Sequence, residues 1–190
     1  MAGPTDRERW NEKWAGSDAG TGHGSKVVDL LAPWLPATGN LLDVAGGGST
    51  ASLEFARRGL TVTVADVSDI GLRQARDRAA AEGLVVSTVE VDLSTEPLPP
   101  GPWNVITVAN YLQRDLFPAM VGALAPGGLL GVAIATVTNL ERHSRPGRQH
   151  SLEPGELPTL VSGVEVLHHS EKWRPNGRHE AHLVAHVPVL

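Results

Sequence analysis

Short apolar runs alternate along most of the chain with segments that have the composition and spacing of helices. The apolar runs predict five strands, at residues 41–44, 60–68, 85–93, 103–110 and 129–135. The intervening segments predict helices at residues 26–35, 49–58, 69–82 and 114–123. Because the strands and helices alternate without internal repeats, we expect a parallel sheet with helices on both faces.

The C-terminal part of the chain breaks this alternation. Residues 164–172 and 179–189 are two strand-like runs, and the segment 173–178 between them contains Pro and Gly. Two runs joined in this way predict a hairpin, so we expect an antiparallel pair of strands at one edge of the sheet.

The first part of the chain predicts a separate short helix over residues 6–15, capped by Thr5 or Asp6. Trp10 and Trp14 fall on one face of this helix because they are four residues apart. The rings either pack the helix against the core or form part of a lid over a bound ligand. The glycine-rich residues 16–24 that follow are expected to be mobile.

The most informative stretch is residues 41–49. There the first strand ends in Asp43, and Gly46, Gly47 and Gly48 follow at once. A strand, a tight loop and a helix start occur in this order in nucleotide-cofactor folds. Glycines let the backbone turn sharply and approach a ligand closely. Asp43 would repel a pyrophosphate and attract a cationic ligand, such as S-adenosylmethionine (SAM) with its ammonium and sulfonium.

Two alternatives remain for this loop. It also matches a dinucleotide pattern, as Gly46-x-Gly48-x-x-Ala51, although a lone match of this kind is weak. The loop could also be a structural turn without a ligand. Asp43 directly before the loop and the C-terminal hairpin favour SAM over NAD or FAD.

The pattern of a strand ending in an acid occurs twice more. Asp66 lies about twenty residues beyond the glycine loop, the spacing at which an acid binds the ribose hydroxyls. Asp92 ends the third strand and predicts adenine recognition, with Leu93 supplying a backbone amide and an apolar wall. Alternatively, Asp66 stabilises the start of the helix near Ser68, and Asp92 caps a turn.

With these motifs in order, and Pro126, Gly127 and Gly128 before the fifth strand, the chain resembles the class I SAM-dependent methyltransferases over roughly residues 25–190. The resemblance implies an α/β fold, a Rossmann-like three-layer sandwich with a mostly parallel seven-stranded sheet, in a single domain over residues 1–190. It implies SAM as the cofactor and S-adenosylhomocysteine as the product. The cofactor-binding residues are then expected to be Asp43, Ala45, Gly46, Gly47, Asp66, Val67, Asp92, Leu93, Asn110 and Trp14.

The glycine loop departs from the family pattern at two positions. Ala45 stands where the first glycine is usual, and Ser49 where the last glycine often stands. Both residues are small, so we expect cofactor binding to be retained, with the Cβ atom of Ala45 narrowing the room beside the methionine tail.

Three shorter motifs resemble one subgroup of the family. Residues 9–14, 110–117 and 152–157 are similar to bacterial methyltransferases related to the tellurite-resistance and thiopurine enzymes. These motifs imply a small-molecule acceptor and leave its identity open.

Composition narrows the class of protein. The 190 residues suit one domain, and 41% hydrophobic residues suffice for its core. A net charge of −5 argues against a nucleic-acid substrate. The chain has no cysteine, no apolar run of the ~20 residues that a membrane span needs, and no signal-peptide pattern at its start. We expect a cytoplasmic enzyme without a membrane or nucleic-acid partner, of unknown oligomeric state.

Residues 141–150 form a basic segment in this otherwise acidic chain. The segment follows the fifth strand, so it is expected above the sheet edge at which a methyl group would be presented. It could equally be a solvated loop. As an acceptor site, it offers Arg142 and His143 as catalytic candidates, with His143 removing a proton near neutral pH. Substrate-binding candidates there and after the fourth strand are Tyr111, Arg114, Arg145, Arg148 and His150.

A metal site is not expected. His182 and His186 share one face of the last predicted strand, whereas His179 does not. With no cysteine and no carboxylate at a fitting offset, solvent-facing histidines are the better interpretation.

The sequence therefore predicts in-line methyl transfer from SAM to a small molecule, with positioning as the main catalytic contribution. A SAM-binding sensor or partner subunit without catalysis is an alternative, and an NAD(P)-binding oxidoreductase is a weaker one. Asn110 is followed by Tyr111 and Leu112 rather than by a Pro-Pro-Tyr sequence, which counts against methylation of nucleobase or glutamine amino groups.

Overall fold

The structure, a computed structural model, describes residues 5–16 and 25–189. The predicted mobility of residues 17–24 lies outside these described residues. No helix in the described ranges is long and apolar enough to cross a membrane.

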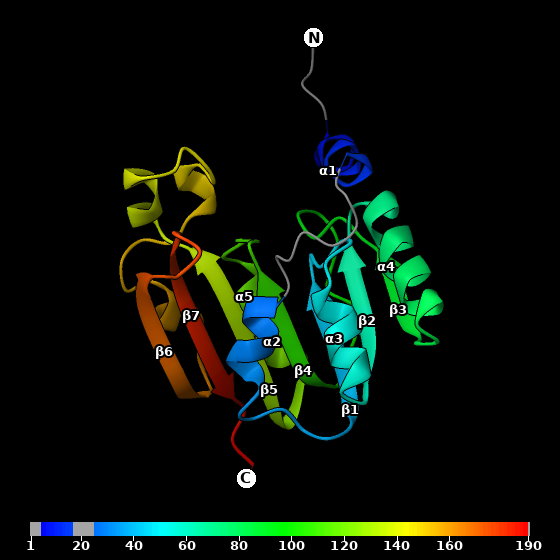
Figure 1. Cartoon of the computed structure of the whole chain (residues 1–190). Coiled ribbons are helices and arrows are strands. Elements are labelled where there is room, and N and C mark those ends of the chain that lie inside the picture. The colour runs from blue at the N-terminus through cyan, green and yellow to red at the C-terminus, as the bar shows by residue number, and fades with distance from the viewer. Residues whose placement is uncertain (1–4, 17–24, 190) are drawn as a thin grey trace.

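The described residues form one seven-stranded sheet of strand order β3-β2-β1-β4-β5-β7-β6 (Figure 1). The parallel strands are β1 (Gly39–Val44), β2 (Leu60–Asp66), β3 (Val86–Glu90), β4 (Trp103–Ala109) and β5 (Leu124–Ala135). The strands β6 (Glu165–Trp173) and β7 (His179–His186) form the expected hairpin, and β7 runs antiparallel to β5. The predicted fold class is confirmed.

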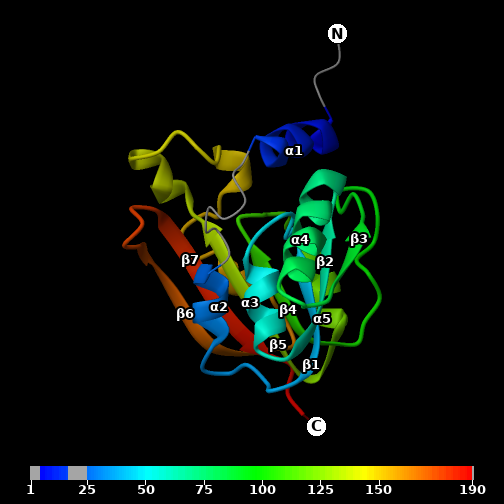
Figure 2. The same ribbon diagram turned by 45° about the vertical axis from the view of Figure 1, so that its right-hand side comes forward.

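Helices cover both faces of this sheet, which makes three layers (Figures 1 and 2). One face carries α2 (Ser25–Leu31), α3 (Ala51–Arg57) and α4 (Asp69–Ala81), and the other carries α5 (Leu116–Gly122). The ten-residue helix α1 (Asp6–Ala15) lies above the carboxyl ends of the strands and contacts α4. Three short 3-10 turns follow β5: η1 (Val137–Glu141), η2 (Arg148–His150) and η3 (Leu157–Leu160).

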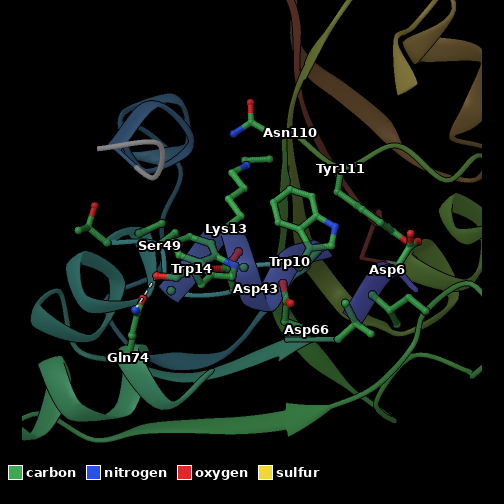
Figure 3. A pocket seen from close by; sticks show the side chains of 18 of the residues that line it. Asp6, Trp10, Lys13, Trp14, Asp43, Ser49, Asp66, Gln74, Asn110 and Tyr111 are labelled. Atoms are coloured by element: carbon green, nitrogen blue, oxygen red, sulfur yellow. Dashed lines mark hydrogen bonds between the residues drawn. The ribbon is translucent and has the colours of Figure 1, made fainter. Parts of the chain in front are cut away.

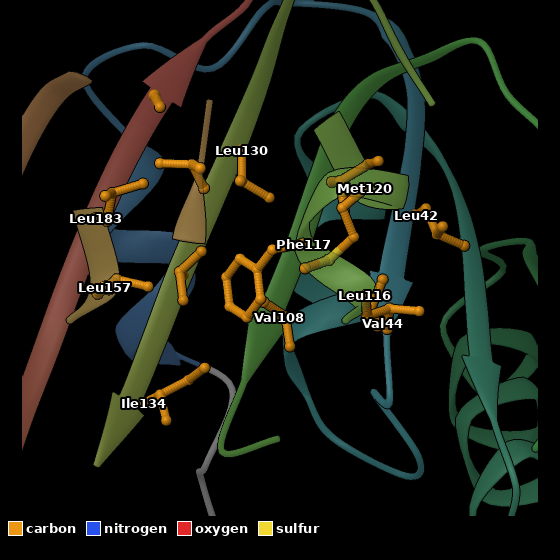
Figure 4. Packing of buried hydrophobic residues seen from close by; sticks show 14 of the residues in the cluster. Leu42, Val44, Val108, Leu116, Phe117, Met120, Leu130, Ile134, Leu157 and Leu183 are labelled. Atoms are coloured by element: carbon orange, nitrogen blue, oxygen red, sulfur yellow. The ribbon is translucent and has the colours of Figure 1, made fainter. Parts of the chain in front are cut away.

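The sheet separates two hydrophobic clusters because successive strand residues point to opposite faces. In β1, Leu41 packs with α2 and α3, whereas its neighbour Leu42 packs on the α5 side. Phe117 and Met120 of α5 are each 1% exposed in that second cluster (Figure 4). Burying each such side chain stabilises the fold by about 1.5–3 kcal/mol, which fixes the central strands whose carboxyl ends carry the site.

Local signals set most helix ends. The side chain of Thr5 accepts a hydrogen bond from the backbone of Glu8 and the side chain of Glu8 accepts one in return, so α1 begins with a capping box. Ser68 caps α4, as its hydroxyl accepts from the backbone N–H of Gly71 at 3.1 Å. The prediction that α2 extends to residue 35 was wrong. The helix ends at Leu31 because Pro33 lacks the N–H that another turn would use.

Candidate functional site

A cavity of about 400 Å³ lies at the carboxyl ends of β1, β2 and β4, below α1 (Figure 3). This is the point at which the strand order reverses, between β1 and β4, where open α/β sheets bind their ligands. Nine of the ten predicted cofactor residues line the cavity: Trp14, Asp43, Ala45, Gly46, Asp66, Val67, Asp92, Leu93 and Asn110. The tenth, Gly47, lies in the same loop, behind the ring of Trp14.

The glycine loop leaves no space for larger side chains. A Cβ atom on Gly46 would lie 2.5 Å from Oδ2 of Asp43. Gly47 has a φ of +50°, in the left-handed region, and a Cβ there would lie 2.6 Å from the indole of Trp14. Ala45 also has a positive φ, of +53°, which costs an L-residue about 1–2 kcal/mol and accounts for the glycine that is usual at its position.

Asp43 carries the least satisfied polar group of the site. Its side chain is 3% exposed, and Oδ1 accepts a hydrogen bond from the hydroxyl of Thr107 at 3.0 Å. Oδ2 is buried and has no hydrogen-bond partner. Burial raises the pKa of Asp43 to about 7, against the opposing effect of the Thr107 hydrogen bond. A cationic ligand would supply the missing partner and restore the charge.

Asp66 is 7% exposed and also lines the cavity. Its Oδ1 accepts from the backbone N–H of Ser68 at 2.8 Å. Burial raises the pKa of Asp66 to about 6, although backbone N–H groups of the adjoining turn favour the charged form. Both interpretations of this residue therefore have structural support: it caps the turn before α4, and it presents a carboxylate to the cavity.

Asp92 stands at the end of the third strand segment. Its Oδ1 accepts from the backbone N–H of Ser94 at 3.0 Å and from the Ser94 hydroxyl at 2.6 Å, and these bonds lower the pKa of Asp92. The turn-capping role is thus present. Asp92 and Leu93 line the cavity as well, so adenine recognition stays a prediction.

The helix α1 forms the roof of the cavity, to which Trp10, Lys13 and Trp14 contribute (Figure 3). None of its residues is buried. Polar contacts hold it to α4: Nδ2 of Asn11 donates to Asp69 at 2.8 Å, the Ser68 hydroxyl donates to Asn11 at 2.6 Å, and Gln74 donates to the carbonyl of Trp14 at 2.9 Å. This arrangement suits a lid, and it places the tryptophan rings over the cavity rather than in the core.

Asn110 and Tyr111, directly after β4, lie on the side of the cavity opposite Gln74 (Figure 3). Asn110 has a φ of +59° and accepts a hydrogen bond on Oδ1 from Nζ of Lys26 at 2.7 Å. The hydroxyl of Tyr111 donates to Gln113 at 2.5 Å. Burial raises the pKa of Tyr111 to about 12, so its phenol stays protonated at neutral pH.

The expectation of solvent-facing histidines in the last strand was wrong for His182. This residue is 8% exposed because β7 lies between β5 and β6, with α2 packed above it. Its Nε2 is 2.9 Å from Oε2 of Glu180, a carboxylate that is 1% exposed. His186 instead pairs with Glu165, and His179 with Thr136. The described residues contain no cluster suited to a metal ion.

The basic segment rises at the same end of the sheet as α1 (Figures 1 and 2), yet none of its predicted residues lines the cavity. The side chains of Arg142, His143 and Arg148 have local partners. Arg142 stacks on the ring of Trp173 at 3.8 Å, the ring of His143 contacts the carbonyl of Gly177 at 2.8 Å, and the carbonyl of Arg145 accepts from Asn139. Arg148 pairs with Glu153, Arg114 pairs with Glu156, and His150 is exposed in η2. Roles in acceptor binding or catalysis stay predictions for these residues.

Sequence reasoning missed several lining residues. Lys13 falls on the face of α1 that carries Trp10, and its ammonium lies 4.1 Å from that ring. Gln74 and Arg78 extend from α4, one helical turn apart, and Arg78 donates to the carbonyl of Gly48. The spacing of Gln74 and Arg78 shows that they share a face. Only the tertiary structure shows that this face meets the glycine loop.

The chain is similar to known methyltransferases. Residues 41–128 match the family described as "Methyltransferase domain". The chain is 34% identical to the ubiquinone/menaquinone biosynthesis C-methyltransferase UbiE of Azotobacter vinelandii over 100 residues, 47% of this chain and 40% of that protein. It is 33% identical to a ubiquinone biosynthesis O-methyltransferase of Caulobacter sp. over 150 residues, 66% of this chain and 58% of that protein. The chain thus spans about half the length of these relatives.

Among solved structures, TehB from Haemophilus influenzae has the same fold. It superposes with a TM-score of 0.69 at 18% sequence identity, over 95% of this chain and 66% of that one. At this identity the likeness concerns the fold alone.

Proposed function

We propose that this chain, which belongs to the class I SAM-dependent methyltransferases, catalyses transfer of the SAM methyl group to a small-molecule acceptor. One observation carries the proposal. The buried Oδ2 of Asp43 has no hydrogen-bond partner. It lies beside the glycine loop, where a Cβ atom on Gly46 would occupy the space next to this oxygen. A buried carboxylate oxygen without a hydrogen-bond partner destabilises the folded chain unless a ligand supplies that partner.

The chemistry of the lining residues fits SAM. Asp43 would hold the ammonium and Asp66 the ribose hydroxyls, while Val67, Asp92 and Leu93 would enclose the adenine. When bound, SAM supplies an electrophilic methyl group on a sulfonium. Asp43 directly precedes the glycine loop, where a dinucleotide would place its pyrophosphate, so its buried carboxylate suits the cationic SAM better than NAD.

The protein's own contribution to methyl transfer is positioning and exclusion of water. The glycine loop and the roof formed by α1 enclose the cavity from two sides, and Asn110 and Tyr111 form the wall at the end of β4. The phenol of Tyr111 stays protonated and its one O–H donates to Gln113, so its oxygen can accept a hydrogen bond from the methyl acceptor but cannot act as a general base at neutral pH. An acceptor that must lose a proton would need another base, for which His143 remains the candidate.

Three observations support a small acceptor. The net charge is −5, the cavity holds about 400 Å³, and the two relatives named above act in quinone biosynthesis. Phenols and quinone precursors are therefore the first acceptors to test, followed by thiols and tellurite.

The experiment combines two measurements on the purified chain. Calorimetric titration with SAM, S-adenosylhomocysteine and NAD tests the cofactor, and transfer of a labelled methyl group to the acceptor panel tests catalysis. We expect SAM binding and labelled product from at least one phenolic acceptor. SAM binding without transfer to any acceptor would favour the sensor interpretation, and binding of NAD alone would favour the oxidoreductase.

Asp66→Asn tests the contact with the ribose. It should weaken SAM binding about ten- to hundredfold, since a hydrogen bond to a charged group contributes roughly 1.5–3 kcal/mol. The matched variant is Asp77→Asn, which changes an exposed acid on α4 that does not line the cavity. It should leave SAM affinity unchanged.

A further inference from the structure

One face of α4 contacts both the glycine loop and the roof of the cavity. Gly71, Gln74 and Arg78 share this face because they are three and four residues apart in the helix. We refer to these three residues as the α4 face. Gln74 and Arg78 also line the cavity. The α4 face is thus placed between the loop that would hold a cofactor and the helix that covers it.

Arg78 joins the glycine loop to α4. Its guanidinium donates to the backbone carbonyl of Gly48 and, through Nε at 3.1 Å, to the backbone carbonyl of Gln74. It forms no ion pair with a described carboxylate, and burial lowers its pKa. The donors of a planar guanidinium point in fixed directions, so the two bonds together hold Gly48 against the helix. Arg78 therefore acts on the backbone of the loop.

Gln74 joins the roof to the same helix. Its Nε2 donates at 2.9 Å to the backbone carbonyl of Trp14, in the last turn of α1 (Figure 3). The indole of Trp14 lies between the helix and the loop. A Cβ atom on Gly71 would be 2.9 Å from Cδ1 of this ring, and one on Gly48 would be 3.0 Å from its Cε3. The roof, the helix and the loop therefore meet at one ring.

Contacts nearer the start of α1 do not reach the glycine loop. Asn11 forms hydrogen bonds with Ser68 and Asp69 at the start of α4. Arg7 pairs with Glu90 at the surface, where the two side chains are 52% and 40% exposed, and exposed pairs of this kind contribute little. The end of α1 that carries Trp14 is thus the end that is linked to the loop.

The opposite wall of the cavity is attached to other elements. Asn110 accepts a hydrogen bond from Nζ of Lys26 at 2.7 Å, and the same ammonium donates to Oε1 of Glu180 at 2.6 Å. Lys26 belongs to α2 and Glu180 to β7, so this wall is held by the sheet and its covering helix. A movement of α1 would disturb the glycine loop and leave this wall in place.

We propose that Gln74 and Arg78 are positioning residues that make the roof and the glycine loop open and close as one element. When α1 lifts, the ring of Trp14 leaves the loop, and the loop loses the surface against which it packs. A ligand that fixes the loop holds the roof closed in return, because both share the α4 face. The role in ligand release rests on the proposed function: S-adenosylhomocysteine would leave only when the loop and the roof have opened together.

The first test needs no ligand. Hydrogen exchange measured by mass spectrometry reports opening of the roof in a peptide covering residues 6–15 and opening of the loop in one covering residues 45–52. Gln74→Met keeps the volume of the side chain and removes the bond to the roof, whereas Arg78→Met removes the bond to the loop. Each variant should speed exchange in both peptides by the same factor, about two- to tenfold for one lost hydrogen bond. In the double variant, both peptides should show the product of the two factors.

Arg76→Met is the matched control, because Arg76 is exposed on α4 and bonds to Thr88 in β3. It should change exchange in neither peptide. A peptide covering β5, residues 124–135, should exchange at the wild-type rate in every variant, which separates opening of this element from a loss of overall stability.

The second test follows S-adenosylhomocysteine by stopped-flow tryptophan fluorescence. Gln74→Met and Arg78→Met should each raise its dissociation rate about two- to tenfold. The association rate should stay within about twofold, because the ligand enters the open form. Arg78→Lys keeps one donor for the carbonyl of Gly48, so it should release the ligand more slowly than Arg78→Met.

Faster exchange confined to the roof in Gln74→Met and to the loop in Arg78→Met would overturn the proposal, since the two parts would then open separately. Unchanged exchange in both peptides, or equally faster exchange in β5, would overturn it as well. Wild-type dissociation rates in both variants would remove the role in ligand release. If the wild-type chain bound no S-adenosylhomocysteine while the exchange results held, the proposed function would fail and the coupling of roof and loop would stand.

Discussion

The hydroxyl of Thr107 in β4 donates to Oδ1 of Asp43 in β1, at 3.0 Å across two neighbouring strands. It satisfies one oxygen of a buried carboxylate and leaves the other without a partner. The unpaired oxygen can bind a cation, but it lowers the stability of the protein without ligand. Binding sites often carry such a destabilising group because their function requires it.

Asp43→Asn should stabilise the empty protein at alkaline pH. The pKa of this carboxyl is about 7 in the folded chain against 3.8 for the ordinary group, so the folded state holds the proton more tightly and stability falls as the pH rises from about 4 to 7. The full difference corresponds to a free energy of unfolding on the order of 4 kcal/mol. We expect the variant to melt roughly 5 to 15 °C higher than wild type near pH 8 and at the same temperature near pH 4.

Asp29→Asn is the control for this experiment, because Asp29 is an exposed acid on α2. It should shift the melting temperature at neither pH. Equal melting of Asp43→Asn and wild type near pH 8 would show that burial of Asp43 carries no such cost.

SAM affinity should fall as the solution is acidified. Asp43 must be charged to pair with the ammonium, so below pH 7 binding has to displace a proton and loses up to about tenfold per pH unit. Protonation of Asp66, whose pKa is about 6, adds to the loss at lower pH. Calorimetric titration between about pH 5.5 and 7.5 measures this dependence. 5′-Methylthioadenosine, which lacks the ammonium, should show only the part due to Asp66.

Gly46→Ala should abolish detectable SAM binding while the chain still folds. The new methyl group would lie 2.5 Å from Oδ2 of Asp43 and 2.9 Å from Val64, so the carboxylate or the loop must move. Gly122→Ala is the matched control, since Gly122 ends α5 and nothing outside its own helix turn lies within 4 Å of the position that a new methyl group would take. Far-UV circular dichroism verifies the fold of both variants. Normal SAM affinity in Gly46→Ala would contradict the close packing of the glycine loop against Asp43.

Trp14→Ala should shorten the residence time of SAM. The indole packs over Gly47, Gly48 and Gly71, and α1 is otherwise held by polar contacts with α4. Loss of this contact favours opening of the roof, so the dissociation rate in stopped-flow measurements should rise about tenfold. Glu12→Ala, at an exposed position of the same helix, should leave the rate unchanged. A SAM dissociation rate in Trp14→Ala equal to that of wild type would indicate that opening of α1 does not control release from the cavity.

The strands and the glycine loop could be predicted from sequence because their signals are local. The acids that end β1 and β2 follow apolar runs, and the parallel order of the sheet brings Asp43 and Asp66 to one edge. The end of α2 was placed at residue 35, whereas Pro33 already removes a backbone donor and the helix ends at Leu31.

Other features depend on pairings between distant segments and left no local signal. His182 was expected to face solvent, in a hairpin placed at the edge of the sheet, yet β7 is an inner strand that is covered by α2. The partners of Arg142 and His143, which are Trp173 and the carbonyl of Gly177, come from the C-terminal hairpin. Lys26 has no motif around it, and its meeting with Glu180 spans 154 residues of sequence.

That long span has a consequence for the newly made chain. A ribosome adds about 5–20 residues per second, so roughly eight to thirty seconds separate the synthesis of Lys26 from that of Glu180. During this interval β1 to β5 and the glycine loop are already available for pairing, while the lysine has no carboxylate to meet. The emerging chain can therefore form most of its sheet before it acquires the last two strands and, with them, the carboxylate that pairs with Lys26.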